Sequence, residues 1–167
     1  MPDNQTTIPL GQATIRKDGL FDLEKLYKIP TDWATSKGYN RLEKENAKKY
    51  AADGGEYTVA WNFRKKVDDY VRYDVDIELW VYKGLEVLVE QKGQQLKRVK
   101  GKIDIKIKLS MTTNYEGAFK LSKPQQFIRK FLEKYIWKNR LENLGGAGNI
   151  EFLDLQAKMK QGLEQYT

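Results

Sequence analysis

The chain has 167 residues and a formal net charge of +7, and it contains neither cysteine nor histidine. This length fits one domain that can bury enough surface to fold without disulfide bonds or a structural metal. The missing residue types exclude thiolate nucleophiles, Cys/His zinc sites and mechanisms that need an imidazole base, so we expect no enzymatic activity, no metal site and no cofactor.

The first 17 residues are polar and are interrupted by Pro2, Pro9 and Gly11. They lack the basic and apolar segments of a secretory signal, and no apolar run in the chain approaches the ~18 residues of a membrane span. We therefore expect a cytoplasmic protein, or a component of a particle assembled in the cytoplasm, with no membrane partner. Because only the stretch 13–15 could pair with a strand, we predict that residues 1–17 form an extended arm held by a partner.

A helix is predicted after this arm. Asp22 is a suitable N-cap, because its side chain can accept a hydrogen bond from the first turn. Pro30 removes a backbone donor and disfavours helical geometry in the residue before it, so we expect a kink or a restart capped by Thr31. Gly38 is the expected end of the helix.

Four or five antiparallel strands are predicted in the middle of the chain. Apolar and polar residues alternate over 57–63, 71–81 and 99–111, as half-buried strands require. Shorter strands are expected at 85–89, after a break at Lys83-Gly84, and at 115–119, and Gln91-Lys92-Gly93 predicts a hairpin turn. The fold class is therefore α+β, a twisted antiparallel meander with an N-terminal helix and two C-terminal helices.

Two of these strands carry complementary charges. Asp76 and Glu78 lie on one face of the acidic strand 71–81, and Lys106 and Lys108 lie on one face of the basic strand 99–111. Opposite charges directly across an antiparallel pair contribute roughly 0.2–1 kcal/mol each. We predict that the two strands are antiparallel neighbours with both charge sets on the same sheet face.

Two helices are predicted at the C-terminus. The first begins at Ser122-Lys123-Pro124, with proline just inside its N-terminus. Its apolar stripe, suited to lie across the sheet, consists of Phe127, Ile128, Phe131, Leu132, Tyr135 and Ile136. The glycines of the segment 145–148 indicate a hinge, and Asn149 can cap a last helix. Residues 18–144 would then form a single α+β domain, between the arm 1–17 and a C-terminal helix at 149–167.

The last helix provides the first candidate site, a partner interface. Its apolar residues recur at three or four positions and need to be covered. They are Phe152, Leu155, Met159, Leu163 and Tyr166. With a hinge before it, this helix could cover its own domain or a neighbouring subunit, and we predict the second.

Basic residues interleaved with aromatic ones provide the second candidate site. Clusters on the first C-terminal helix and on the basic strand could follow the phosphates of RNA or another polyanion. The residues are Lys123, Lys130, Lys134, Trp137, Lys138, Arg140, Lys102 and Lys106. Lysine predominates, whereas arginine suits bidentate phosphate and base contacts, so only non-specific binding is implied. An ordinary solvated charged surface is the alternative.

Parts of the sequence resemble a group of small uncharacterised archaeal proteins. The resemblance is carried by the run from Asp18 to Tyr27, by Trp33 and Gly38-Tyr39, and by the strand meander followed by 127–136. It covers roughly residues 16–144. The first helix of that group looks uninterrupted, whereas this chain has Pro30. The resemblance implies a shared fold and no particular activity.

The sequence contains no recognisable set of catalytic residues, and three of its segments need partners. Together these features predict a non-enzymatic structural or assembly protein. It would associate with copies of itself or with a larger assembly through its N-terminal arm, a sheet edge and its C-terminal helix. The alternative is an RNA- or ribosome-associated basic binding module.

Overall fold

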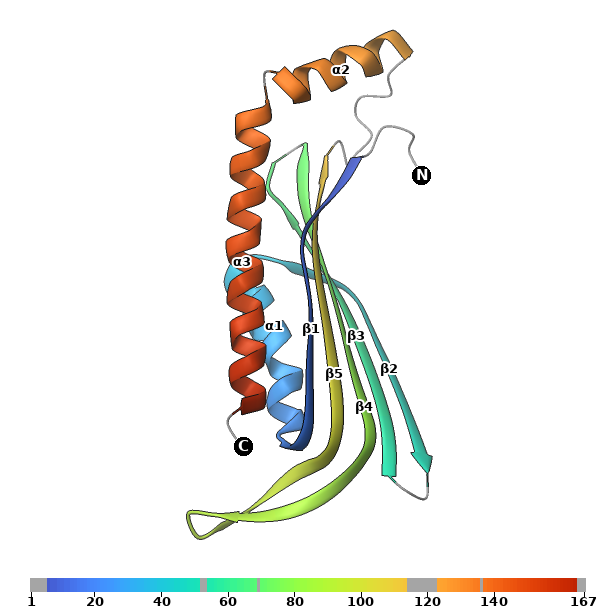
Figure 1. Ribbon diagram of the computed structural model, residues 1–167, viewed down its shortest axis with the longest axis vertical. Helices are drawn as coiled ribbons and strands as arrows, with labels where there is room; N and C mark the ends of the chain where they lie inside the picture. Colours follow the sequence, from blue (N-terminus) through green and yellow to red (C-terminus); the bar gives the residue numbers. More distant parts are fainter. Residues whose placement is uncertain (1–5, 52–53, 69, 114–122, 136, 165–167) are drawn as a thin grey trace.

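The computed structural model describes residues 6–51, 54–68, 70–113, 123–135 and 137–164, which form a five-stranded antiparallel sheet and three helices (Figure 1). The strands are β1 (Thr6–Phe21), β2 (Asn40–Ala51), β3 (Gly54–Lys66), β4 (Val71–Gln91) and β5 (Gln94–Thr113), in the order β1-β5-β4-β3-β2. Helices α1 (Leu23–Lys37) and α3 (Lys138–Glu164) cover one face, called the inner face here, and α2 (Lys123–Tyr135) lies across the end of α3 (Figure 1). The predicted α+β class is confirmed.

The predicted pairing of the acidic and basic strands is also confirmed. Asp76 lies opposite Lys108 and Glu78 lies opposite Lys106 in the β4–β5 ladder, on the outer face of the sheet. The alternating apolar residues of both strands point to the inner face, where they are fully buried. The inner set includes Ile77, Leu79, Ile103, Ile105, Ile107 and Leu109. The alternation of apolar and polar residues therefore correctly predicted which side chains of each strand are buried.

The hairpin that joins β4 and β5 ends in the predicted two-residue turn. Lys92 and Gly93 both have positive φ, 52° and 75°, as a type I′ turn requires. The predicted break at Lys83-Gly84 is wrong, because β4 continues through it as one strand. The β4–β5 register shifts between Tyr82 and Leu85, and Lys83 has a φ of 51°. This bulge bends the hairpin, which curls at its lower end in Figure 1.

The N-terminal arm is corrected for the residues that the structure describes. β1 pairs with β5 from Thr6, opposite Thr113, to Phe21, opposite Val99. The proline and glycine that indicated an interrupted arm flank a bulge, since the register shifts between Pro9 and Gly11. An edge strand tolerates both features because one of its sides has no neighbour. Residues 1–5 lie outside the described residues.

The other edge strand, β2, was not expected. The segment over 40–51 is strongly charged and shows no clear apolar alternation, yet it pairs with β3 along its length. Charged residues are common on edge strands, where they oppose pairing with a second sheet. The predicted strand at 115–119 lies outside the described residues, so the fifth strand of the sheet is not the one expected.

Both predicted ends of the first helix are confirmed. The Asp22 side chain accepts a hydrogen bond from the Lys25 amide at 3.2 Å, and Gly38 has a left-handed φ of 81°. The predicted restart at Thr31 is wrong, because α1 continues through Pro30 as one helix. Pro30 is buried on the same helix face as Leu26 and Trp33. Burial of this face offsets the ~3 kcal/mol that an interior proline costs.

The glycine-rich segment before Asn149 is part of a continuous α3 and not a hinge. A Cβ on Gly148 would lie 2.7 Å from the Leu10 Cδ1 atom, and a Cβ on Gly11 would lie 2.7 Å from the Phe152 ring. These two glycines therefore permit α3 and β1 to approach closely. Asn149 is not a cap, and its Nδ2 atom donates to the Leu10 carbonyl at 2.8 Å, at the β1 bulge.

A continuous helix predicts that Gly145→Ala raises the free energy of unfolding by about 0.5–1 kcal/mol, because alanine is the better helix former. The new Cβ would lie 3.4 Å from the Leu10 Cδ2 atom, an ordinary contact. Urea denaturation measures the change. Gly148→Val is the contrasting variant, expected to lower stability by about 1–3 kcal/mol through overpacking. A hinge would be favoured if neither substitution changed the free energy of unfolding.

Candidate interaction surfaces

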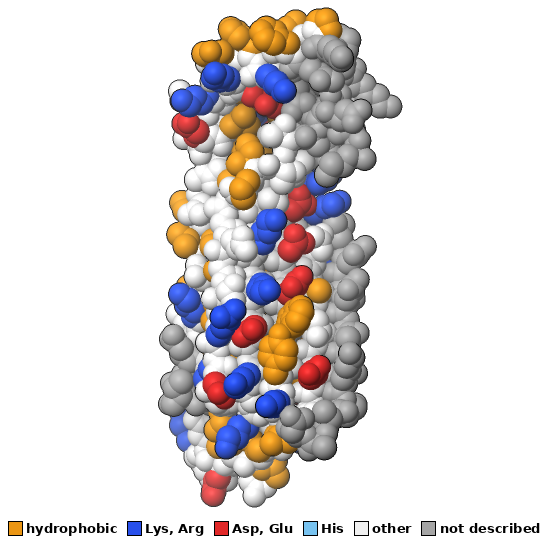
Figure 2. All heavy atoms as spheres, turned by 45° about the vertical axis from the view of Figure 1, so that its right-hand side comes forward, with side chains coloured by type: hydrophobic (Ala, Val, Ile, Leu, Met, Phe, Trp, Pro, Cys, Tyr) orange, Lys and Arg blue, Asp and Glu red, His pale blue; other side chains and the backbone are white. Residues whose placement is uncertain are grey.

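The outer face of the sheet carries the two candidate lysines of the basic strand. Lys106 lies opposite Glu78 in the ladder, and its Nζ atom lies 5.7 Å from the centre of the Trp80 ring. Asp104 stands between Lys102 and Lys106 on β5 and forms an ion pair with Arg16 at 3.6 Å. Positive and negative side chains are mixed over this face in Figure 2. Lys102 and Lys106 therefore belong to a charge-balanced surface and not to a continuous basic one.

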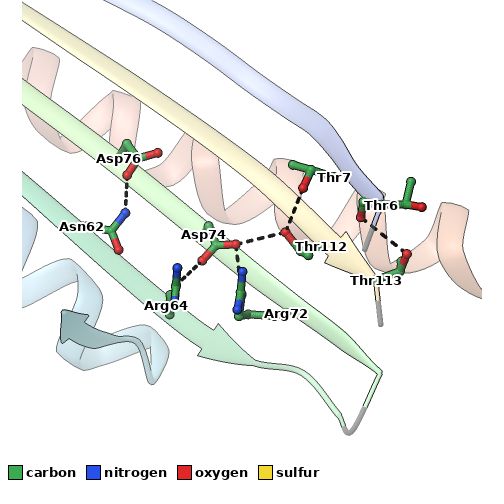
Figure 3. Close-up of polar contacts among 9 residues, drawn as sticks. All are labelled: Thr6, Thr7, Asn62, Arg64, Arg72, Asp74, Asp76, Thr112 and Thr113. Atoms are coloured by element: carbon green, nitrogen blue, oxygen red, sulfur yellow. Dashed lines mark hydrogen bonds and ion pairs between the residues drawn. The ribbon is translucent and has the colours of Figure 1, made fainter. Parts of the chain in front are cut away.

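A buried carboxylate connects four strands at one end of the same face (Figure 3). Asp74 is only 9% exposed, and its two oxygens accept hydrogen bonds from Arg64 Nε at 2.8 Å and from Arg72 Nε at 3.1 Å. The Thr112 hydroxyl also donates to Asp74 at 3.1 Å and lies 3.4 Å from the Thr7 hydroxyl on β1. Because donors occupy both oxygens, Asp74 holds the sheet together and is not placed to bind a substrate.

A second polar cluster joins α3 to the inner face. Glu151 on α3 accepts hydrogen bonds from the Lys65 ammonium at 2.5 Å and from the Tyr39 hydroxyl at 2.6 Å. The Lys65 Nζ atom lies 5.1 Å from the Tyr39 ring centre and 5.8 Å from that of Tyr73, and the Tyr73 hydroxyl donates to the Leu144 carbonyl. Burial raises the pKa of the Tyr39 phenol, and its hydrogen bond to Glu151 raises that pKa further. The phenol therefore stays protonated, as a donor must.

The lysine cluster predicted for one long helix is divided between two helices. Lys123, Lys130 and Lys134 belong to α2, whereas Lys138 and Arg140 belong to α3, and the chain turns sharply between the two helices (Figure 1). These residues therefore do not form the single face that was expected. The expected helix is not continuous, because α2 ends at Tyr135 and α3 begins at Lys138.

The residues at this turn contact the segment between β3 and β4. The Trp137 ring lies 5.5 Å from the Tyr70 ring in an edge-on arrangement, and Arg140 forms an ion pair with Asp68. Lys138 lies 3.9 Å from Glu142 on its own helix. Trp137 and Arg140 thus attach the start of α3 to the segment between β3 and β4.

The apolar stripe of α2 does not cover the sheet, contrary to expectation. Its large residues are 50–73% exposed, and they are Phe127, Ile128, Phe131 and Tyr135. The Tyr70 hydroxyl donates to Glu133, so the carboxylate of α2 faces the body while the apolar side faces solvent. Figure 2 shows hydrophobic side chains along this end of the molecule. Ile136 lies outside the described residues. We call the four exposed residues the α2 face.

The stripe of the last helix covers the sheet instead. Phe152, Leu155, Met159 and Leu163 are at most 5% exposed and belong to the core that α3 forms with the inner face and α1. Their prediction as a partner interface is corrected, because this chain's own strands cover them. Tyr166 lies outside the described residues. Consequently residues 6–17 and 149–164 pack in one unit with the rest of the described chain.

Among the described residues, no group of three or more Asp or Glu side chains is placed to hold a metal ion. No described helix is long and apolar enough to cross a membrane. No protein-family model and no curated protein matches the sequence. The exposed surfaces and their chemistry are therefore the main evidence for a function.

Proposed function

We propose that this protein is a non-enzymatic assembly protein that binds a protein partner through the α2 face. The observation that carries the proposal is the exposure of four large apolar side chains, each at least half accessible, on one helix. Together they expose on the order of 500 Å², which is within the range of the largest apolar patch on a typical monomer. Patches of that size in folded proteins commonly mark interaction sites.

The composition of the α2 face supports a protein partner. Aromatic residues dominate it, and aromatic side chains are common among the residues that contribute most binding energy. Lys130 and Lys134 are exposed on the same helix, and the Lys134 Nζ atom lies 5.4 Å from the Tyr135 ring. An apolar centre beside lysines fits a groove with acidic residues at its rim.

The non-enzymatic part of the proposal rests on the state of the described carboxylates. Asp74 accepts hydrogen bonds from two arginines and a threonine hydroxyl, and Glu151 accepts them from a lysine and a tyrosine hydroxyl. A general acid needs an apolar environment and access to a substrate, and neither carboxylate has both. This supports a binding role over a catalytic one.

RNA binding through the lysines is the alternative proposal, with less support. The lysines named for it fall on α2, on the start of α3 and on the outer sheet face, where acidic side chains alternate with them. Binding of a polyanion draws on many phosphate contacts along one surface. Because the lysines are divided among separate surfaces, fewer of them can contact one polyanion at once, which lowers the affinity expected for it.

Photo-crosslinking in the cells that make the protein tests both proposals. We expect a photoreactive phenylalanine analogue at position 131 to yield a discrete protein adduct, because Phe131 lies within the α2 face. The same analogue at position 80 is the matched control, since Trp80 is an exposed aromatic on the outer sheet face. Phe127→Ser should abolish the adduct from position 131. An adduct to RNA, or equal protein adducts from both positions, would contradict the proposal.

A further inference from the structure

The side of α3 that faces away from the sheet carries a second apolar surface. Ile150 and Leu153 are 69% and 51% exposed, and Gly146 and Ala157 flank them at helical spacing, also exposed. We call these four residues the α3 seam. They recur at intervals of four, three and four residues, which places them in one stripe of a helix with about 3.6 residues per turn. We infer that the α3 seam forms an antiparallel dimer with a second copy of this chain.

The order of side-chain sizes along the seam supports a second copy as the occupant. The order is small, large, large, small, and it is the same in both directions along the helix. Antiparallel pairing centred between positions 150 and 153 sets Ile150 against the second copy's Leu153, and Gly146 against the second copy's Ala157. A two-fold interface requires such self-complementarity, because the same surface must fit itself. The small residues at both ends let the helices approach closely.

The charges beside the seam match the same arrangement. Glu142 precedes the seam and Lys160 follows it, and both side chains are exposed. Antiparallel pairing brings Glu142 near the second copy's Lys160, and two-fold symmetry repeats this contact at the other end. A parallel pair would instead place like charges together. Charge thus selects the antiparallel orientation.

The seam is short, so the dimer is expected to be concentration-dependent. Only two of its four residues have large side chains, Ile150 and Leu153, so it buries less area than a standard stable interface, as in weak or transient complexes. The buried stripe of Phe152, Leu155 and Met159 lies on the opposite side of the helix, so dimerisation leaves the core unchanged.

Antiparallel pairing determines where the two α2 faces lie in the dimer, a point that rests on the proposed function. α3 has 27 residues and is therefore about 40 Å long. α2 precedes it in each copy, so the two α2 faces would lie at opposite ends of the helix pair. The dimer would present two partner-binding surfaces separated by roughly that length, as a protein that bridges two partners requires.

Sedimentation equilibrium over a range of protein concentrations tests the dimer. We expect a reversible monomer–dimer equilibrium that Leu153→Glu shifts at least tenfold toward monomer, with an unchanged circular dichroism spectrum because Leu153 is exposed. Phe131→Ser is the matched control in α2 and should leave the equilibrium unchanged. If Phe131→Ser dissociates the dimer and Leu153→Glu does not, self-association belongs to the α2 face and the inference is wrong. A monomer at every concentration would also overturn it.

A charge exchange tests the orientation. Glu142→Lys and Lys160→Glu should each weaken the dimer, and the double substitution should restore it, because each pair regains opposite charges. Failure of the double substitution to restore the dimer would contradict antiparallel pairing. These measurements use the purified chain alone, so they succeed or fail independently of the crosslinking that tests the α2 face.

Discussion

Leu155→Ala is expected to lower the free energy of unfolding by about 2–5 kcal/mol, the range for removing a fully buried leucine side chain. Leu155 is 0% exposed and lies in the core that α3 forms with the inner face of the sheet. The substitution removes apolar contacts and leaves a cavity that neighbouring side chains fill only in part. Urea denaturation followed by tryptophan fluorescence measures the change, since Trp33 and Trp61 are both buried.

Leu88→Ala is the matched control for this prediction. It removes the same atoms from a leucine that is 63% exposed near the end of β4, so its effect should stay within about 0.5 kcal/mol. Equal effects of the two substitutions would mean that α3 does not rest on its own sheet. In that case the sequence-based interpretation of this stripe as a partner interface would regain support.

The pairing of β4 with β5 was predictable because it depends on residues that are close together in the sequence. Alternation with period two assigned the faces of β4 and β5, and the opposite charges of Asp76 and Lys108 indicated that the strands are neighbours. The helix ends at Asp22 and Gly38 were predicted for the same reason. A cap depends on one side chain or one backbone angle within a few residues.

The edge strands could not be predicted from local patterns. β1 and β2 each have a single neighbour, so neither needs the apolar alternation that marks a central strand. β1 pairs with β5, which lies far away in sequence. β2 pairs with β3, the next strand of the chain, but its charged sequence shows no apolar alternation. The same limit applies to Pro30, whose cost to α1 is offset by burial against elements that the local sequence does not specify.

The two C-terminal stripes show why the sequence did not predict which of them covers the sheet. Both are amphipathic, and amphipathicity indicates that a helix buries one face without indicating what covers it. The outcome depended on Gly11 and Gly148, which lie far apart in the sequence and together let α3 approach β1 closely. Considered separately, Gly11 indicated an interrupted arm and Gly148 indicated a hinge. Their shared role became visible only once the strand and the helix were placed side by side.

Among substitutions of polar residues, Asp74→Ala should have the largest effect, lowering the free energy of unfolding by about 3 kcal/mol. The substitution leaves Arg64 and Arg72 without the carboxylate that both contact, and it removes an acceptor from Thr112. Loss of one partner in an enclosed ion pair costs about 3–5 kcal/mol. We expect a cost at the lower end of this range, because the Arg64 side chain is 44% exposed and water can solvate part of its charge.

Asp76→Ala is the matched control, two residues further along the same strand and face. Asp76 accepts a hydrogen bond from the exposed Asn62 amide and lies opposite Lys108, contacts that water can replace. Its removal should cost no more than about 1 kcal/mol. A large difference between the two aspartates would show that the buried network, and not the general charge of β4, connects β1 to the sheet through Thr7 and Thr112. If the two substitutions cost the same, the buried contacts of Asp74 would contribute no more to stability than the exposed contacts of Asp76.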